Sequence, residues 1–149
     1  MIYHSLFHAV MTYGIIFWGD SSHSTQVFKM QKKVTRIILG HGNRESYRNL
    51  FTKLNILPLM SQYILSLLTF VSNNREQYFE NSEIHNINTR RTFNLNLLRV
   101  HLNIYQKGVY YSGIKIFNSL PWDIKTYTEN PGTFKKAVRN FYTQTPSTH

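Results

Sequence analysis

The 149-residue chain contains no cysteine, and this absence excludes several kinds of chemistry at once. Without cysteine the chain forms no disulfide, holds no zinc ion through thiolates and performs no thiol catalysis. A protein without disulfides is compatible with a reducing compartment. We therefore expect an intracellular location, in the nucleus or the cytoplasm.

Acidic residues are also scarce, because the chain has only 7 of them and its two aspartates are Asp20 and Asp123. Nucleotidyl transfer by two metal ions requires clustered carboxylates that hold Mg²⁺. The sequence contains no Y-x-D-D motif and no comparable pair. We therefore expect no catalytic residue and no metal site in this chain.

Other catalytic and cofactor-binding patterns are incomplete. His4 and His8 have the i, i+4 spacing of a shared metal site, but no H-E-x-x-H glutamate and no third ligand accompany them. Ser22, His23 and Asp20 are neighbours in a polar loop without a nucleophile elbow. Walker A and G-x-G-x-x-G motifs are absent as well. We expect no enzyme activity, no cofactor and no small-molecule substrate.

No hydrophobic run is long enough to cross a bilayer, which takes about 20 residues. The apolar N-terminal stretch is interrupted by polar side chains and lacks the cationic start of a signal peptide. The run from Leu57 to Val71 is too short. We predict no membrane span, and instead a buried helix over 2–17 with a kink near Gly14.

Positive charge, by contrast, is abundant: 17 lysines and arginines give a formal net charge of +10 and a pI near 9.9. Such an excess favours a polyanionic partner, with nucleic acid ranked first and an anionic membrane surface second. With 42% hydrophobic residues the chain can form a core, as one or two small domains.

The stretch FKMQKKVTRIILG, from Phe28 to Gly40, concentrates this charge on one predicted helix. At about 100° per residue its side chains separate into two arcs. The arc predicted to face the core holds Val27, Met30, Val34, Ile37 and Ile38. The opposite arc holds Lys29, Lys32, Lys33 and Arg36. Gly40 is the predicted end of the helix. The basic arc either keeps the helix soluble or contacts phosphates, and Arg44 and Arg48 extend it.

Further helices are predicted from their end signals. Ser46 is a candidate N-cap of a short helix through Leu54, and Pro58 a candidate first residue of the next helix. Pro121 ends a helix that begins near Gly108. The last helix begins at Asn130 and Pro131, buries an apolar stripe that includes Phe134 and Val138, and carries Lys135, Lys136 and Arg139 on its opposite face.

The middle of the chain follows other patterns. Residues 74–83 are polar and suit a linker or surface turn, and apolar residues alternate with polar ones between Ile84 and Tyr105, as in extended chain or a short hairpin. The fold class is therefore mainly α: a small helical bundle, a short extended or hairpin segment and further helices. The predicted division is a bundle over 1–73, a linker over 74–83, a C-terminal region over 84–143 and a tail over 144–149.

Aromatic residues are predicted to belong to the core rather than to stack on bases. This prediction covers Tyr13, Phe17, Trp18, Tyr110, Tyr111, Phe117 and Trp122. The sequence shows no pattern for reading bases, so any nucleic-acid binding is expected to be indifferent to sequence.

Five short motifs occur in a familiar order. They are Y-G-I-x-F-W-G at Tyr13–Gly19, Q-K-K-x-x-R-I-I at Gln31–Ile38, I-L-P-L at Ile56–Leu59, N-T-R at Asn88–Arg90 and N-S-L-P at Asn118–Pro121. In this order, from Tyr3 to Phe141, the chain resembles the C-terminal portion of the reverse transcriptases of non-LTR retrotransposons of the jockey or CR1-like kind.

The resemblance implies a thumb and a following region that help to hold template RNA and nascent DNA, with the polymerase domain missing upstream. The implied partner is an RNA or DNA backbone, held without a catalytic centre in this chain. The predicted contact residues are Lys29, Lys32, Lys33, Arg36, Arg44, Arg48, Arg90 and Arg91. Arg90 and Arg91 alternatively bond to neighbouring carbonyls or acids.

Two other functions stay open at this stage. The chain is alternatively a non-catalytic protein-interaction module, or a partly folded relic of a mobile element, whose first helix exposes an apolar face. A peripheral membrane binder that uses the basic amphipathic helices is the third candidate. The sequence argues against it, because the face opposite Lys29 to Arg36 can be covered by neighbouring helices of a bundle.

Overall fold

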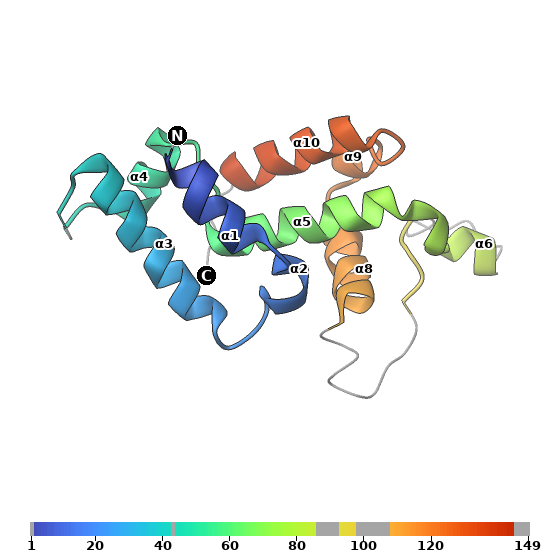
Figure 1. The fold of residues 1–149 in the computed structure, drawn as a ribbon. Coiled ribbons are helices and arrows are strands. Elements are labelled where there is room, and N and C mark those ends of the chain that lie inside the picture. The colour runs from blue at the N-terminus through green and yellow to red at the C-terminus, as the bar shows by residue number, and fades with distance from the viewer. Residues whose placement is uncertain (1, 43, 86–92, 98–107, 145–149) are drawn as a thin grey trace. The chain divides into compact units, whose positions relative to one another are not determined.

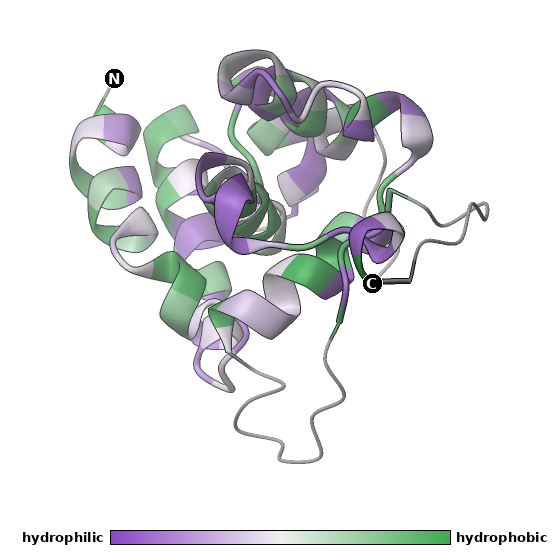
Figure 2. Ribbon diagram, turned by 90° about the vertical axis from the view of Figure 1, so that its right-hand side faces the viewer, coloured by the Kyte–Doolittle hydropathy of each residue, from purple (hydrophilic) through white to green (hydrophobic). Residues whose placement is uncertain are grey.

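The computed structural model describes residues 2–42, 44–85, 93–97 and 108–144 of the chain (Figure 1). These residues are mainly helical and form no strand, which confirms the predicted mainly α fold. Most helices in Figure 2 alternate between hydrophobic and hydrophilic residues along their length, as amphipathic helices do.

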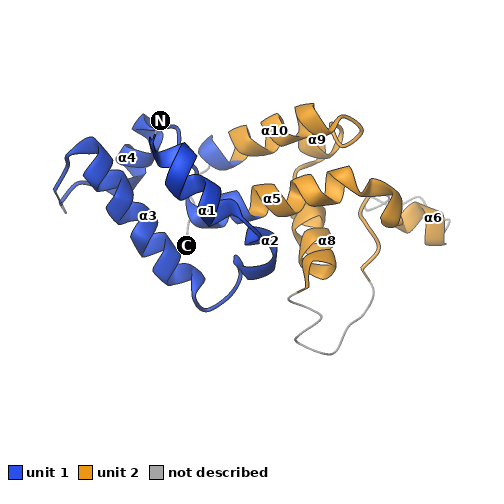
Figure 3. Ribbon diagram, viewed as in Figure 1, with its two compact units in different colours: residues 1–63, 142–149 blue, residues 64–141 orange. Residues whose placement is uncertain are grey.

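The chain divides into two compact units (Figure 3). Unit 1 consists of Met1–Tyr63 with Tyr142–His149, and unit 2 of Ile64–Phe141. The predicted division into 1–73, 74–83, 84–143 and 144–149 rests on sequence composition, whereas these units rest on contacts within the structure. The predicted division therefore stays a prediction.

The described residues of unit 1 up to Tyr63 form a π-helical segment, four α-helices and the first turn of a fifth. They are η1 (Tyr3–His8), α1 (Ala9–Thr12), α2 (Ile15–Trp18), α3 (Ser24–Leu39), α4 (Tyr47–Lys53) and the start of α5 (Leu59–Asn73). The position of Ser46 before α4 and of Pro58 before α5 agrees with the predicted helix starts to within one residue.

The N-terminal segment is helical in three pieces rather than one. The predicted break is at Gly14, which takes a left-handed conformation with φ of 62° between α1 and α2. One face is buried through Tyr3, Met11 and Ile15. The predictions that this segment is buried as a whole and that Tyr13 and Phe17 are core residues are wrong, because both aromatic side chains are exposed.

Helix α3 ends as predicted, because Gly40 adopts φ of 66° and the amides of Gly40 and His41 bond to the carbonyls of the last turn. The predicted core face is wrong in part. The side chains of Met30 and Ile37 are 58% and 68% exposed. Two polar residues, Gln31 and Thr35, are fully buried instead. The helix is therefore turned about its axis relative to the orientation that its hydrophobic pattern predicts.

Gln31 sets this orientation by three hydrogen bonds. Its Nε2 donates to the Tyr3 hydroxyl at 2.8 Å and to the carbonyl of Leu57 at 2.9 Å, and its Oε1 accepts from the amide of Leu59 at 3.0 Å. The Leu59 amide belongs to the first turn of α5, where the helix itself supplies no acceptor. One buried side chain thus joins η1, α3 and the start of α5. Burial also raises the pKa of Tyr3.

The core of unit 1 is rich in aromatic rings. Tyr3, Phe51 and Ile56 form its buried centre. Partly buried hydrophobic residues pack around them, namely Phe7, Phe28, Val34, Ile38, Tyr47 and Leu54. The ring of Tyr47 meets Phe28 at 5.5 Å and Phe51 at 5.6 Å, both edge to face.

Unit 2 is built around the remainder of α5. Its other elements are η2 (Arg75–Gln77), α6 (Asn81–His85), α8 (Val109–Ser119), α9 (Trp122–Lys125) and α10 (Pro131–Gln144), of which the last extends into unit 1. Its largest fully buried side chains are Leu67, Leu68, Val71, Leu95, Ile114, Phe134 and Val138, and Phe117 is nearly so. Helices α5 and α8 approach closely at Gly113, where an added Cβ would lie 2.7 Å from Val71.

Helix α10 agrees with its prediction. It begins at Pro131, and the amide of Thr133 donates to the Asn130 side chain at 3.4 Å. Phe134 and Val138 are buried, while Lys135 and Lys136 are exposed.

Helix α8 ends before Pro121 as predicted, but the prediction for its aromatic residues is only partly right. Phe117 is a core residue of α8, whereas Tyr110 on the same helix is 43% exposed. Trp122, the first residue of α9 and also predicted to be a core residue, is 53% exposed.

Part of the predicted extended segment lies outside the described residues. Ile84 belongs to helix α6, so the extended prediction is wrong there. Leu95 forms an isolated antiparallel bridge with Glu80, in the stretch predicted to be a linker. The Asn118 side chain bonds to both the amide and the carbonyl of Leu95, at 2.8 and 2.9 Å. The amide and the carbonyl of Leu95 are thus both paired with one side chain.

Among the described residues, no helix combines the length and hydropathy that a membrane-spanning segment requires.

Candidate nucleic-acid interface

The four predicted cations of α3 lie within an arc of about 100° on the helix surface. They are Lys29, Lys32, Lys33 and Arg36. Lys29 and Lys33 are exposed, while Lys32 and Arg36 are half-buried. We call these four residues the basic arc.

Lys32 is held in place by aromatic rings. Its Nζ lies 4.7 Å from the ring centroid of Phe28 and 5.3 Å from that of Tyr47. A cation at this distance from an aromatic face gains about 0.5–1 kcal/mol at an exposed site. Because Tyr47 is the first residue of α4, this contact fixes the basic arc beside that helix.

The Arg36 side chain is partly covered. Its Nε atom is buried and has no hydrogen-bond acceptor among the described residues. Such a donor is costly to leave unsatisfied, by about 1–3 kcal/mol. Arg36 also forms no ion pair with a described carboxylate.

Arg44 and Arg48 are exposed on the approach to α4 and on α4 itself. The nearby acid, Glu45, pairs with other side chains: His41 Nδ1 at 2.7 Å and Lys53 Nζ at 3.4 Å. In the described part of the chain, no ion pair involves the basic arc, Arg44 or Arg48. Lys29, Lys33, Arg44 and Arg48 are exposed to solvent, and none of the six cations pairs with a carboxylate of the described residues.

Two cations of unit 2, Lys125 and Arg75, contact other side chains and backbone groups of the protein. Lys125 Nζ donates to the Asn94 side chain and to the Asn118 carbonyl, both at 2.9 Å, and burial lowers its pKa. Arg75 forms an ion pair with Glu80. These two side chains hold the structure together, which leaves them poorly placed for a ligand.

A cleft of about 930 Å³ in unit 2 is lined by several acids, among them Glu76, Glu80, Glu83 and Glu129. Negative side chains repel phosphate, so this cleft does not extend a nucleic-acid surface. Arg90 and Arg91, the last two predicted contact residues, lie outside the described residues.

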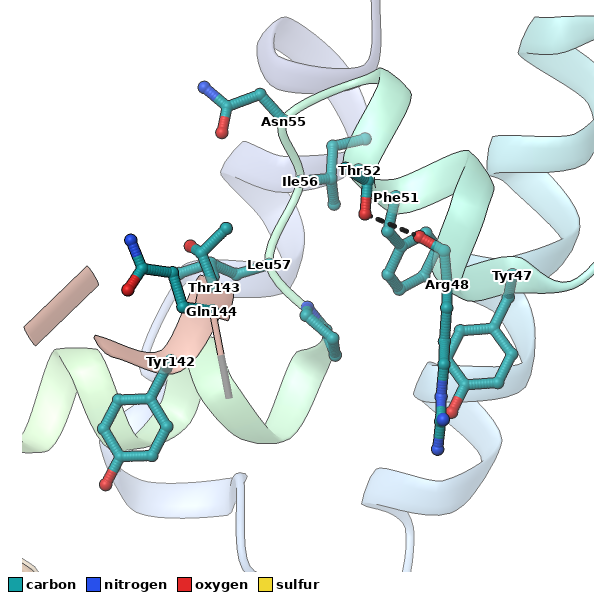
Figure 4. Close-up of a pocket in the computed structure, with 11 residues that line it drawn as sticks. Tyr47, Arg48, Phe51, Thr52, Asn55, Ile56, Leu57, Tyr142, Thr143 and Gln144 are labelled. Carbon is teal, nitrogen blue, oxygen red and sulfur yellow. Dashed lines mark hydrogen bonds between the residues drawn. The ribbon is translucent and has the colours of Figure 1, made fainter. Parts of the chain in front are cut away.

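Sequence reasoning missed a pocket of about 300 Å³ in unit 1 (Figure 4). Buried residues of α4 and of the following turn, Phe51, Ile56 and Leu57, form part of its lining. The turn depends on Asn55, which adopts φ of 53°, a conformation that asparagine tolerates better than most residues.

Polar residues complete the lining of this pocket. Arg48 and Thr52 lie on one side in Figure 4, and Tyr142, Thr143 and Gln144 on the other. Burial raises the pKa of the Tyr142 hydroxyl. No local signal joins residues 47–58 to 142–144, although the I-L-P-L stretch marks the turn.

His4 and His8 are the two histidines at metal-binding spacing on the N-terminal helical segment. The rings of His4 and His8 lie 5.1 Å apart. Within the described ranges, no group of three or more metal-ligating side chains comes together.

No protein-family model, no curated protein and no solved structure matches this chain.

Proposed function

We propose that this chain is a sequence-indifferent nucleic-acid-binding fragment, similar to the thumb and downstream region of a non-LTR retrotransposon reverse transcriptase. In this role it holds the backbone of template and primer and has no catalytic centre of its own. One observation carries the proposal: the basic arc, with Arg44 and Arg48, presents positive charge that no described carboxylate neutralises.

The composition of α3 favours this role over simple solubility. A soluble helix surface ordinarily mixes both signs of charge. Helix α3 contains no acid, and its cations repeat at i, i+3 and i, i+4. Each such like-charged pair destabilises a helix by about 0.2–0.5 kcal/mol. A phosphate backbone would relieve this repulsion, whereas water only screens it.

The salt dependence of binding tests the proposal. Fluorescence anisotropy with a labelled single-stranded RNA and an RNA–DNA hybrid should show log affinity falling linearly with log salt. The slope is expected to be about 0.7–0.9 per phosphate contacted. Replacing Lys29, Lys32, Lys33 and Arg36 by glutamine should weaken binding at low salt and flatten that slope.

A matched variant separates the basic arc from total charge. Glutamine at Lys53, Lys115, Lys135 and Lys136 removes the same charge from other exposed positions. We expect this control to flatten the slope less than the α3 variant. Unchanged binding of the α3 variant at every salt concentration would show that the arc is only a solvated face.

A second candidate, a protein-interaction module, is favoured by the exposed apolar face of the N-terminal segment. Its side chains are 66% to 87% exposed and recur at helical spacing: Ile2, Leu6, Val10, Tyr13 and Phe17. We call these five residues the apolar stripe. An aromatic side chain alone presents about 150–250 Å², so the stripe approaches or exceeds the largest patch of an ordinary monomer, about 300–600 Å².

Sedimentation over a wide range of protein concentration tests this second candidate. An interaction module without its partner should self-associate or aggregate, and the combined change of Leu6, Val10 and Phe17 to glutamine should abolish this behaviour. A chain that stays monomeric and thermally stable at every concentration would speak against the stripe as an interaction surface.

A further inference from the structure

The pocket of unit 1 has the size of a small ligand site. Its volume of about 300 Å³ lies at the lower end of the range for ligand pockets, about 300–1,000 Å³. Such a space accepts one planar heterocycle. It is too small for a folded peptide or for several bases at once.

The lining suits an aromatic ring with polar edges. The buried side chains of Phe51, Ile56 and Leu57 provide apolar surface for the ring faces. The aromatic rings of Tyr47 and Tyr142 also belong to the lining (Figure 4). Stacking of a base on aromatic side chains contributes about 1–3 kcal/mol.

Polar groups at the exposed margin can meet the edges of a base. The Thr52 hydroxyl donates its proton to the Arg48 carbonyl at 2.9 Å, so the oxygen lone pairs are left as acceptors. The exposed amide side chain of Gln144 offers both a donor and an acceptor. The pocket therefore suits a nucleobase as its occupant better than it suits a purely hydrocarbon side chain.

The pocket is also continuous with the cationic surface. Arg48 lines the pocket and faces solvent, and the adjacent Tyr47 carries the Lys32 ammonium group 5.3 Å from its ring. A strand whose phosphates lie along the basic arc therefore passes Tyr47 at the margin of the pocket.

From this geometry we propose that the pocket receives one unstacked nucleobase of a bound single strand, while Arg48 contacts an adjoining phosphate. This inference rests on the proposed function, because the base in the pocket belongs to the strand whose phosphates contact the basic arc.

Two short single-stranded probes test the pocket. One carries only abasic sites, and the other has the same number of phosphates and a single thymine at its centre. The unmodified protein should bind the second probe about 5- to 140-fold more tightly, as stacking of one base predicts.

The outcomes separate the pocket from the proposed function. If both probes bind equally, with the expected salt dependence, the pocket inference is wrong and the proposed function stands. If neither probe binds even at low salt, both are wrong.

Two variants on α4 locate the base. Thr52→Trp fills the pocket from an exposed position and should bring the ratio of the affinities for the thymine and abasic probes close to one. Asn49→Trp adds the same side chain at an exposed position that does not line the pocket, and should leave the gain intact. A gain that survives Thr52→Trp would overturn the assignment.

A cross-linking measurement on the unmodified chain covers the case in which Thr52→Trp does not fold. With 4-thiothymine as the single base, irradiation should join the probe to residues that line the pocket, Tyr47 or Tyr142 foremost. Cross-links that map only to other parts of the chain would overturn the inference.

Discussion

Helices α3 and α10 share one sequence pattern but differ in the face that they bury. Both have apolar residues at helical spacing opposite a row of cations. In α10 the predicted residues Phe134 and Val138 are buried. In α3 the predicted Met30 and Ile37 are exposed, and the polar Gln31 is buried in their place.

The difference shows that hydrogen bonding can outweigh hydropathy when it sets the orientation of a helix. A buried polar group is costly unless its hydrogen bonds are made. Gln31 makes three, and the Thr35 hydroxyl donates to the Gln31 carbonyl at 2.8 Å. Helix α10 has no buried polar side chain, so its apolar residues alone determine which face of the helix is buried.

The largest effect is expected in α10, where hydropathy alone determines the buried face. Phe134→Ala removes a fully buried ring that lies 6.3 Å from the ring of Phe117. We expect a loss of about 3–5 kcal/mol in the free energy of unfolding, measured by urea denaturation. Phe134→Leu keeps most of the volume and should cost clearly less. Equal losses for the two variants would mean that the ring does not fill a packed core.

The next largest effect is expected at Gln31, whose hydrogen bonds determine which face of α3 is buried. Gln31→Met keeps the side-chain volume but leaves the Leu57 carbonyl and the Leu59 amide without their partner. Each unsatisfied buried group costs about 1–3 kcal/mol, so for the two groups we expect a loss of about 2–6 kcal/mol in the free energy of unfolding.

The control for this variant is Gln26→Met, because Gln26 is exposed on the same helix. It should change the free energy of unfolding by less than about 0.5 kcal/mol. A stabilising Gln31→Met would show that hydropathy, and not the hydrogen-bond network, determines which face of α3 is buried.

The ends of the helices were predictable because they depend on local chemistry. Gly40 ends α3, Pro121 follows the end of α8, and Asn130 with Pro131 begins α10, as their sequence signals predict. The facing of α3 was not predictable, because the partners of Gln31 lie 26 to 28 residues away in sequence. The bridge between Leu95 and Glu80 is non-local in the same way.

The candidate site also has one part that could be predicted from local sequence, the basic arc, and one part that could not, the pocket. The spacing of cations on α3 is a helical property, so the basic arc follows from sequence alone. The pocket depends on a turn at Asn55 and on residues 142–144 that come from the other end of the chain. A pattern within one helix cannot reveal such a site.

A smaller effect is expected at the C-terminal end of α3. Gly40→Ala forces an alanine into φ of 66°, although no atom lies within 4 Å of the added Cβ. The cost is then a backbone cost, about 1–2 kcal/mol in the free energy of unfolding. Gly42→Ala, also without neighbours but without a positive φ, is the matched control and should be nearly neutral. Equal effects of the two variants would contradict the left-handed end of α3.

The smallest effect separates the two orientations of α3 most directly. If the helix is turned as the structure has it, Met30→Gln and Ile37→Gln alter only solvated side chains, and each should change the free energy of unfolding by less than about 0.5 kcal/mol. Val34→Gln on the same helix places an amide against the aromatic core and should cost about 1–3 kcal/mol. Urea denaturation of the three variants measures these losses. If the free energy of unfolding fell as much for Met30→Gln and Ile37→Gln as for Val34→Gln, the hydrophobic pattern, and not Gln31, would determine the orientation of the basic arc.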